Sequence, residues 1–580
     1  MCGIYGITDK NESLIHNYIR TCSHRGPDGH KVWSSPDNKI TLGHNLLSIM
    51  GQPNDSVQPW KTPAGNYLIY NGEIFNYYEL TTKYKSKGFV GETGCDTELL
   101  AWGLDMFGYN FIEEIDSMHG FAYYKVTENE LWLSRDHAGI KPLYYAEIKQ
   151  GLIFGSEIKG MLDHVPGSRK IDPLAFSCMA HVGVNVTQNT FFSNVKKLLS
   201  GETIIYDIAN KRVKSKKRNL IIPSNNNNFN AEEFRQITRD SVKMCSIGRR
   251  KIGIFLSGGL DSGMIAYEHS QLHKVTNTYT NKMEPNIIWR EDDHNDDHNK
   301  ALQLAEQFKF NHKIVTMTPQ LLKQFWQDSI YYMEQPVYNP SMVMYYYTNK
   351  VLSEDGIVVT LAGDMGDEVL GGYPKYWKLR NKSVKSWEEL VAAWMNRIKR
   401  PIAVSNYPID RNELTNYLVN NLPSELYNSD DPVNSYMALD CVTQVPEEFF
   451  IRNDTYGMAF SMEGRFPLAT KKFMKYGLSI PSNQKIGRNK SDTKLLSKKA
   501  YAKIFPDTIV NKHKTGWTAP IKGWIQDENV AKDYYQKQIN QDDCLKNVVV
   551  RSNETTKAAI PAWIMREWAN KFNMNFTSKY

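Results

Sequence analysis

One strand–turn–helix unit in the second half of the chain most constrains its fold. The apolar run Lys251–Leu256 ends in the turn Ser257-Gly-Gly-Leu-Asp-Ser262, and helical spacing follows it. A second apolar run, Gly356–Leu361, predicts another buried strand. Strands that alternate with helices form a parallel sheet, which binds its ligands at the carboxyl ends of the strands. Because the N–H groups of a glycine-rich turn and of a helix N-terminus can face an anion there, we expect this turn to bind phosphate.

Acidic residues follow the second of these apolar runs. The segment Ala362-Gly-Asp-Met-Gly-Asp-Glu368 comes directly after Gly356–Leu361 and leads into a further glycine pair. Its carboxylates can therefore reach the same cleft as the Ser257 turn.

The first two hundred residues have a different pattern. Short β-rich runs such as Tyr67–Tyr70 and Leu152–Phe154 are separated by Gly, Asn and Pro turns, and this predicts layered sheets. Ser224–Asn230 is a low-complexity polar stretch of the kind that joins domains. With 580 residues, 41% of them hydrophobic, the chain is long enough for each part to bury its own core. We predict one domain at residues 1–215 and a second at residues 230–580.

The composition excludes several classes of protein. The seven cysteines are scattered singly, so neither a disulfide framework nor a zinc knuckle is indicated, and a cytoplasmic location is predicted. No stretch is apolar for the length that a membrane span needs. Residues 211–218 hold six cations, to which a nucleic acid could bind. No aromatic residue is interleaved with them, so we favour a solvated surface hairpin and expect neither a nucleic acid nor a membrane as partner.

Cys2 supplies both a nucleophile and a base once Met1 is removed. Its thiol then lies beside a free α-amine, whose reference pKa near ~8 lets it accept a proton at neutral pH. Asn71 and Gly72 follow the strand candidate Tyr67–Tyr70. Their amide and backbone N–H groups are suitable for holding a tetrahedral oxyanion, although the same segment is equally compatible with a hairpin turn.

Five segments in order resemble those of the class II glutamine amidotransferases. They are Met1-Cys-Gly-Ile, His24-Arg-Gly-Pro-Asp28, Asn71-Gly-Glu-Ile, Asp96-Thr-Glu98 and Ser134-Arg-Asp-His-Ala-Gly-Ile-Lys-Pro-Leu-Tyr-Tyr145. The resemblance implies an αββα N-terminal-nucleophile hydrolase sandwich that releases ammonia from glutamine. Cys2 would attack the amide, and Asn71 with Gly72 would form the oxyanion hole. Glu73 and Asp96 would bind the amino end of glutamine.

One position departs from this family. Its members usually have an arginine in a His-x-Arg-Leu-Ser-Ile segment that clamps the glutamine carboxylate, whereas this chain reads His44-Asn-Leu-Leu-Ser-Ile49. Leu46 cannot form the bidentate pair that makes an Arg–carboxylate contact strong. The departure predicts weak glutamine binding, a replacement cation from elsewhere, or a preference for free ammonia.

The Ser257 turn resembles the signature of the ATP pyrophosphatases, which cleave between the α and β phosphates. The acidic segment resembles, by position, the Ser-Gly-Glu-Gly-Ser-Asp-Glu segment of asparagine synthetases. Asp261 and Asp367 would then hold Mg²⁺, and Asp364 would be the counterpart of a functional glutamate. Its shorter side chain implies that the acceptor sits differently or that the backbone compensates. The implied ATP- and pyrophosphate-binding residues are Phe255, Leu256, Ser257, Gly258, Gly259, Asp261, Ser262 and Gly363.

Two cations lie in further segments that resemble this family. Met462-Glu-Gly-Arg-Phe-Pro467 contains Arg465, which either meets phosphate or forms an ion pair at the domain interface. Lys494 begins a lysine-bearing helix, and we expect it to stabilise charge on the α-phosphate during transfer. Lys514-Thr-Gly-Trp517 resembles another loop of the family.

The resemblance to glutamine-hydrolysing asparagine synthetases covers nearly the whole chain. It implies a two-domain α/β and α+β protein, in which a doubly wound parallel sheet of ATP-pyrophosphatase type with a helical extension follows the sandwich. ATP with Mg²⁺ would adenylate aspartate, and ammonia from glutamine would convert the acyl-adenylate to asparagine, AMP and pyrophosphate, with glutamate as the spent donor. Ammonia must travel unprotonated, which favours an apolar passage between the domains.

Glutamine, aspartate and ATP are the expected partners, and a homodimer is compatible with the resemblance. Two alternatives stay open at this point. A relative with the same chemistry could amidate a different carboxylate, and a noncatalytic binding protein could retain the fold.

Overall fold

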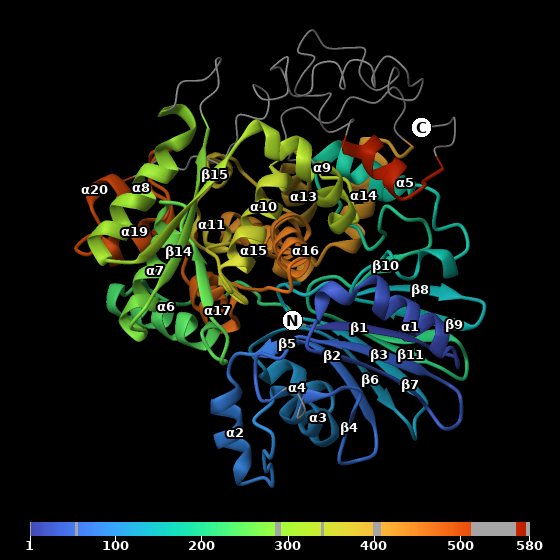
Figure 1. Ribbon diagram of the computed structural model, residues 1–580. Coiled ribbons are helices and arrows are strands. Elements are labelled where there is room, and N and C mark those ends of the chain that lie inside the picture. The colour runs from blue at the N-terminus through green and yellow to red at the C-terminus, as the bar shows by residue number, and fades with distance from the viewer. Residues whose placement is uncertain are drawn as a thin grey trace.

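The computed structural model describes residues 2–52, 56–284, 292–337, 341–397, 408–511 and 564–575 (Figure 1). Two layered sheets occupy the first part of the chain, and a parallel sheet surrounded by helices follows residue 230. The predicted loop Lys514–Trp517 lies outside the described residues.

Two antiparallel sheets pack face to face in the first part. Apolar side chains that include Ile4, Leu42, Ile69 and Leu133 are buried in one cluster, and β1 contacts β5 across the two sheets. In spatial order, the first sheet contains β10 (Lys196–Lys197), β8 (Tyr144–Ile148), β9 (Gly151–Gly155), β1 (Gly3–Ile7), β3 (Thr41–Leu46) and β2 (Gly29–Ser34). The second sheet contains β12 (Arg212–Arg218), β11 (Glu202–Asp207), β7 (Glu130–Arg135), β6 (Ser117–Lys125), β5 (Tyr67–Ile74) and β4 (Trp60–Lys61).

Helices cover both sheets of this sandwich. Helix α1 (Glu12–Thr21) packs on the first sheet, and the Asn11 side chain caps it by accepting from the Leu14 N–H. Helix α3 (Asp96–Phe107) packs on β5 of the second sheet. The predicted αββα arrangement is therefore confirmed. The other helices of this part are α2 (Tyr77–Lys85), α4 (Tyr109–Glu114) and α5 (Pro173–Val182).

Five parallel strands form the sheet of the second part. The strand order reverses between β13 and β16, because the chain runs from β13 outward to one edge and then returns to build the other side. In such sheets the ligand crevice lies at this switch point, outside the carboxyl ends of the strands. In spatial order the strands are β15 (Asn311–Met317), β14 (Asn277–Met283), β13 (Ile252–Phe255), β16 (Val359–Leu361) and β17 (Glu463–Arg465).

The strand ends at the switch point lead directly into helices. Helix α7 (Leu260–Leu272) follows the Ser257 turn, and the short α11 (Gly366–Leu370) follows β16.

A π-helical segment, Val445–Phe450, leads into α16 (Ile451–Met458). The other helices of this part are α6 (Ala231–Cys245), α8 (Asp292–Phe308), α9 (Pro319–Met333), α10 (Met342–Glu354), α12 (Pro374–Arg380), α13 (Trp387–Met395), α14 (Arg411–Asn421), α15 (Pro432–Val442), α17 (Lys471–Ser479), α18 (Ser482–Lys485), α19 (Leu495–Tyr501) and α20 (Asp507–Val510).

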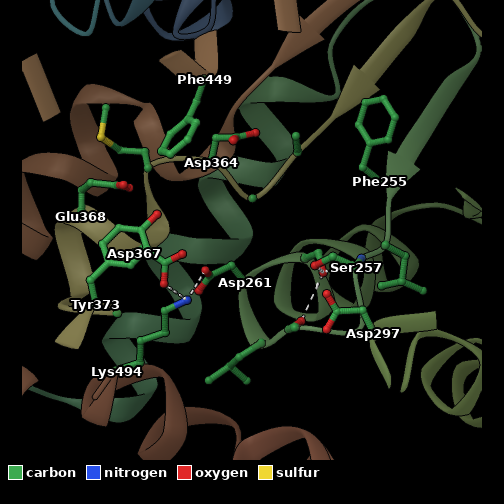
Figure 2. A pocket seen from close by; sticks show the side chains of 18 of the residues that line it. Phe255, Ser257, Asp261, Asp297, Asp364, Asp367, Glu368, Tyr373, Phe449 and Lys494 are labelled. Atoms are coloured by element: carbon green, nitrogen blue, oxygen red, sulfur yellow. Dashed lines mark hydrogen bonds and ion pairs between the residues drawn. The ribbon is translucent and has the colours of Figure 1, made fainter. Parts of the chain in front are cut away.

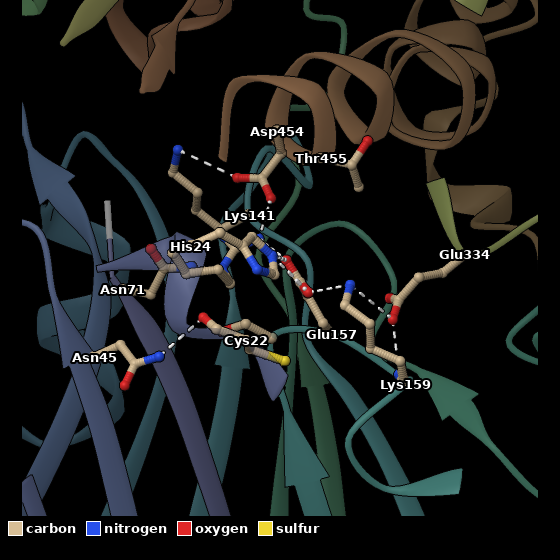
Figure 3. Close-up of polar contacts among 12 residues, drawn as sticks. Cys22, His24, Asn45, Asn71, Lys141, Glu157, Lys159, Glu334, Asp454 and Thr455 are labelled. Carbon is tan, nitrogen blue, oxygen red and sulfur yellow. Dashed lines mark hydrogen bonds and ion pairs between the residues drawn. The ribbon is translucent and has the colours of Figure 1, made fainter. Parts of the chain in front are cut away.

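Buried ion pairs join the two parts (Figure 3). The Arg25 guanidinium is fully buried and contacts Glu157 at 3.0 Å and Asp454 of α16 at 2.9 Å. Lys159 lies between Glu157 and Glu334, which follows α9. Because an unpaired buried charge is costly, these pairs favour one arrangement of the two parts.

Several simpler predictions can be compared with the structure. Strand β12 pairs with β11 and exposes alternate side chains, so the favoured surface hairpin is confirmed for the basic run. Residues 219–230 contain neither helix nor strand, and Asn230 caps α6. Across the described residues, no helix combines the length and apolar character that crossing a membrane requires. The six cysteines in that part of the chain are free thiols.

Two candidate active sites

Cys2 lines a small cavity in the sandwich. The cavity, here called the Cys2 pocket, has a volume of about 30 Å³, which is space for about two water molecules. Burial raises the pKa of the Cys2 thiol to about 11, against the opposing effect of the amino-terminal charge. The thiol therefore needs a base to become a nucleophile at neutral pH. The described residues that line the pocket are Cys2, Leu46, Leu47, Ser48, Ile49, Met50, Ser56, Gln58, Tyr70, Gly72, Glu73, Cys95, Asp96, Thr97 and Glu463.

The predicted oxyanion residues face Cys2 from the second sheet. The Cys2 backbone N–H donates to Asn71 Oδ1 at 3.0 Å, while the buried Asn71 Nδ2 has no hydrogen-bond partner. Gly72 lines the same pocket, and a Cβ there would lie 2.2 Å from the Met118 carbonyl oxygen. Both residues belong to strand β5, so the hairpin-turn alternative is wrong. A buried amide with an unused donor beside a thiol fits the electrostatic requirement of an oxyanion hole.

The predicted amino-group ligands also line the Cys2 pocket. Asp96 Oδ2 accepts from the Ile74 N–H at 2.9 Å and from the Tyr70 hydroxyl at 3.0 Å. Burial raises the pKa of Asp96 to about 6, although these two hydrogen bonds lower it. Burial also raises the pKa of Glu73, whose Oε1 atom has no hydrogen-bond partner. The pocket thus presents acidic groups suited to an ammonium ion.

Strand β17 of the second part extends to this pocket. The Arg465 guanidinium contacts Glu73 at 2.7 Å and Glu463 at 2.6 Å, and all three side chains are buried. Of the two alternatives for Arg465, the interface ion pair is therefore correct and the phosphate contact is wrong. Burial raises the pKa of Glu463, but the amino-terminal charge and then Arg465 lower it to about 2. The sequence alone did not mark Glu463, although this residue lies in the family-like segment Met462–Pro467.

A second and much larger cavity lies at the switch point of the parallel sheet (Figure 2). This Ser257 pocket has a volume of about 600 Å³, within the usual range for small-molecule sites. The predicted residues that line it are Phe255, Leu256, Ser257, Gly259, Asp261, Ser262, Gly363, Asp364, Asp367 and Lys494. Of the predicted set, Gly258 does not line the pocket. It instead packs against α8, where a Cβ would lie 2.3 Å from the Asp297 carbonyl oxygen.

Two carboxylates from separate strand ends converge on one cation in this pocket. The Lys494 ammonium pairs with Asp261, after β13, and with Asp367 Oδ1, after β16, at 2.6 Å (Figure 2). Since one ammonium reaches both carboxylates, a single metal ion fits the same pair. The sequence prediction that these two residues lie within reach of one cation agrees with this geometry.

Asp364 lies on another side of the Ser257 pocket, away from Lys494 (Figure 2). Its Oδ2 atom accepts from Asn453 Nδ2 of α16 at 3.3 Å. The neighbouring Arg452 stacks on Tyr345 with its guanidinium carbon 3.8 Å from the ring centroid. Sequence reasoning missed Asn453 and Arg452, because nothing in the α16 sequence marks them as pocket residues.

The comparisons with known proteins cover most of the chain. Residues 233–571 match the family model described as asparagine synthase, and residues 1–218 match that of a glutamine amidotransferase domain. Asparagine synthetase (glutamine-hydrolyzing) 1 of Bacillus subtilis is 25% identical over 91% of this chain and 88% of its own length. Asparagine synthetase B (glutamine-hydrolyzing) of Escherichia coli is 24% identical over 98% of this chain and 90% of its own.

Among solved structures, an allosteric regulatory enzyme of purine biosynthesis matches 48% of this chain and 65% of its own, with 15% identity and a TM-score of 0.29. A similarity this low supports no argument about the chain. The sandwich with Cys2 in its pocket and the parallel sheet with its switch-point cavity correspond to the two matched models. Because the larger match spans more than half of the residues, the chain belongs to the asparagine synthase family.

Proposed function

We propose that the protein is an asparagine synthetase that amidates aspartate with ammonia taken from glutamine. The observation that carries the proposal is the convergence of Asp261 and Asp367 on one cation position at the switch point. Residues 1–215 would form the glutaminase domain and residues 230–580 the ATP-dependent synthetase domain. A cytoplasmic location and a homodimer stay predictions from the sequence.

Glutamine hydrolysis would begin at Cys2. With Met1 removed, the α-amine takes the thiol proton, and the thiolate attacks the side-chain amide of glutamine. Glu463 lines the same pocket as Cys2, so its carboxylate would stabilise the protonated amine that forms in this step. The unused Asn71 Nδ2 donor, with the Gly72 N–H, would hold the oxyanion. Glutamine is far larger than the Cys2 pocket, so part of the pocket wall must move for it to bind.

Adenylation of the acceptor would take place in the Ser257 pocket. The Ser257 turn and the N-terminus of α7 face the pocket and suit the triphosphate of ATP. Mg²⁺ held by Asp261 and Asp367 would supply charge neutralisation on the phosphates. Lys494 would then move from these carboxylates to the α-phosphate and stabilise the charge that develops during transfer.

An apolar cluster offers ammonia a route between the two pockets. Leu47 and Ile49 line the Cys2 pocket and pack in one buried cluster with Val359 of β16 and Met458 of α16. Strand β16 leads to Asp364, and α16 carries Asn453. A route lined by these side chains favours neutral ammonia, because the ammonium ion is costly to desolvate.

One observation favours an acceptor other than aspartate. Asp364 stands where the family has a longer glutamate, and its carboxylate is hydrogen-bonded to Asn453. An acceptor that reaches further toward α16 than aspartate does would suit this arrangement. The second candidate function is therefore amidation of a different carboxylate by the same chemistry.

One assay separates these functions. The full chain is incubated with ATP, Mg²⁺, glutamine and a panel of carboxylic acids, and pyrophosphate, glutamate and the amidated product are measured. Pyrophosphate and asparagine that form only with aspartate are the expected result. Pyrophosphate with another acid would favour the second function, and no pyrophosphate with any acid would support a noncatalytic protein.

A further inference from the structure

The described residues that line the Cys2 pocket offer no lysine or arginine for the carboxylate of glutamine. Among its described lining residues are three acidic side chains, Glu73, Asp96 and Glu463, but neither a lysine nor an arginine. Leu46 occupies the position of the family arginine and is buried. Free amino acids are zwitterions, so a lining whose acidic side chains suit the ammonium end of glutamine leaves its carboxylate in need of a cation.

One cation of the second part reaches the rim of this pocket. Arg249 lies in the loop between α6 and β13. Its Nη2 donates to the Ser48 hydroxyl at 2.9 Å, and its Nη1 donates to Gln52 Oε1 at 2.9 Å. Ser48 lines the pocket and is buried, whereas Arg249 itself is exposed. The guanidinium therefore binds the segment that follows Leu46, at a residue that lines the cavity.

The charges of the neighbouring arginines are already neutralised. Arg250 pairs with Asp28 at 2.6 Å and donates to the Ser48 carbonyl oxygen. Arg465 pairs with Glu73 and Glu463. Arg249 contacts neutral oxygens, and no carboxylate of the described residues lies within ion-pair distance of it. Of these three arginines it is the one whose charge is available to a ligand.

We propose that Arg249 binds the carboxylate of glutamine and thereby does the work of the family arginine, whose position Leu46 occupies in this chain. Exchange of its neutral partners, Ser48 and Gln52, for a carboxylate would form the stronger, charge-assisted pair. The clamp would come from the second part of the chain, in the loop that leads to β13 and the Ser257 turn. Glutamine would then be bound by both parts at once. This inference rests on the glutaminase activity proposed above.

The test compares glutamine kinetics of the wild-type chain with those of Arg249→Ala. We expect the KM for glutamine to rise about ten- to a hundredfold with kcat little changed, because a charge-assisted contact made in the ground state is lost. Synthesis driven by an ammonium salt bypasses the Cys2 pocket and is the internal reference for each variant. Lys243→Ala is the matched control, because Lys243 is an exposed cation in the last turn of the preceding helix α6.

A rescue variant distinguishes binding of the glutamine carboxylate by Arg249 from a merely structural role of this residue. Leu46→Arg in the Arg249→Ala background should restore a low KM, since it returns the cation to the family position. A KM for glutamine that is unchanged in Arg249→Ala, or that rises equally in Lys243→Ala, would overturn the inference.

Binding is measured separately from catalysis. Isothermal titration measures glutamine binding to Cys2→Ala and to Cys2→Ala/Arg249→Ala. The Kd of the double variant should be about ten- to a hundredfold higher. Equal Kd values overturn the clamp whatever the activity. A wild-type chain that binds glutamine through Arg249 but forms no glutamate would instead refute the proposed function and support the clamp.

Discussion

The two pockets differ in how many of their side chains already stand where the proposed reactions need them. The Ser257 pocket has its carboxylates and its lysine in place, with Lys494 between Asp261 and Asp367. The thiol of the Cys2 pocket is protonated and the neighbouring Asn71 has an unused donor, but the pocket's volume of about 30 Å³ leaves no room for an amino acid. Changes to single residues should therefore be most visible in the binding of glutamine.

Asp96 should make glutamine binding depend on pH. Burial raises its pKa to about 6, so below that pH Asp96 gains a proton and loses the charge that would pair with the ammonium group of glutamine. We expect the KM for glutamine to rise about tenfold between pH 7 and pH 5. Steady-state glutaminase assays across this range measure it, and Asp96→Asn should show a high KM at every pH. If Asp96→Asn keeps the wild-type pH dependence, another group is responsible.

In the Ser257 turn, the backbone requires a glycine at position 258 but has room for a side chain at position 259. Gly258 has a φ of +65°, and a Cβ there would lie 2.3 Å from the Asp297 carbonyl oxygen of α8. Gly259 has a φ of −90°, and its nearest contact would be Ser257 Oγ at 3.3 Å. The two glycines are adjacent in sequence, but only the first combines a left-handed conformation with close packing.

We therefore expect Gly258→Ala to be more destabilising than Gly259→Ala. The first change should lower the free energy of unfolding by about 1–3 kcal/mol, because the backbone must leave its conformation or push α8 away. The second should cost less than about 1 kcal/mol. Urea unfolding monitored by circular dichroism compares the two variants with the wild-type chain. Equal losses of stability would contradict this account of the turn.

The sequence was sufficient to predict the elements that carry glycine-rich or acidic motifs. The runs Lys251–Leu256 and Gly356–Leu361 contain the shorter strands β13 and β16, whose adjacency at the switch point explains why the motifs after them meet. The register of β5 was not predictable, because Asn71 and Gly72 favour turns and only pairing with β6 places them in a strand. Arg249, Glu463 and Asn453 reach the pockets through tertiary packing, which no local pattern encodes.

Buried ion pairs, as well as apolar packing, join the two parts of the chain. Arg25 is fully buried between Glu157 of its own part and Asp454 of the other. Arg465 makes the reverse connection, from β17 to Glu73 in the sandwich. Since each arginine serves carboxylates of both parts, separation of the parts would leave buried charges unpaired.

Arg25→Met should weaken this junction strongly. Removing one member of a buried ion pair typically costs about 3–5 kcal/mol, because the remaining carboxylates lose their counter-ion. We expect a lower midpoint for the first thermal transition in scanning calorimetry. Arg20→Met is the matched control, because Arg20 is exposed on α1 and, among the described residues, its side chain donates a hydrogen bond only to Asn17. Its midpoint should stay near that of the wild-type chain, and a similar value for Arg25→Met would refute the role of the junction.

The position of Glu463 in the wall of the Cys2 pocket has a consequence for protein synthesis. On a translating ribosome, the sandwich leaves the exit tunnel long before strand β17 has been made. A nascent chain at that stage has neither Glu463 in the wall of its Cys2 pocket nor Arg465 to pair with Glu73. Under the function proposed above, an unfinished chain would therefore lack part of its glutamine site until β17 has been added.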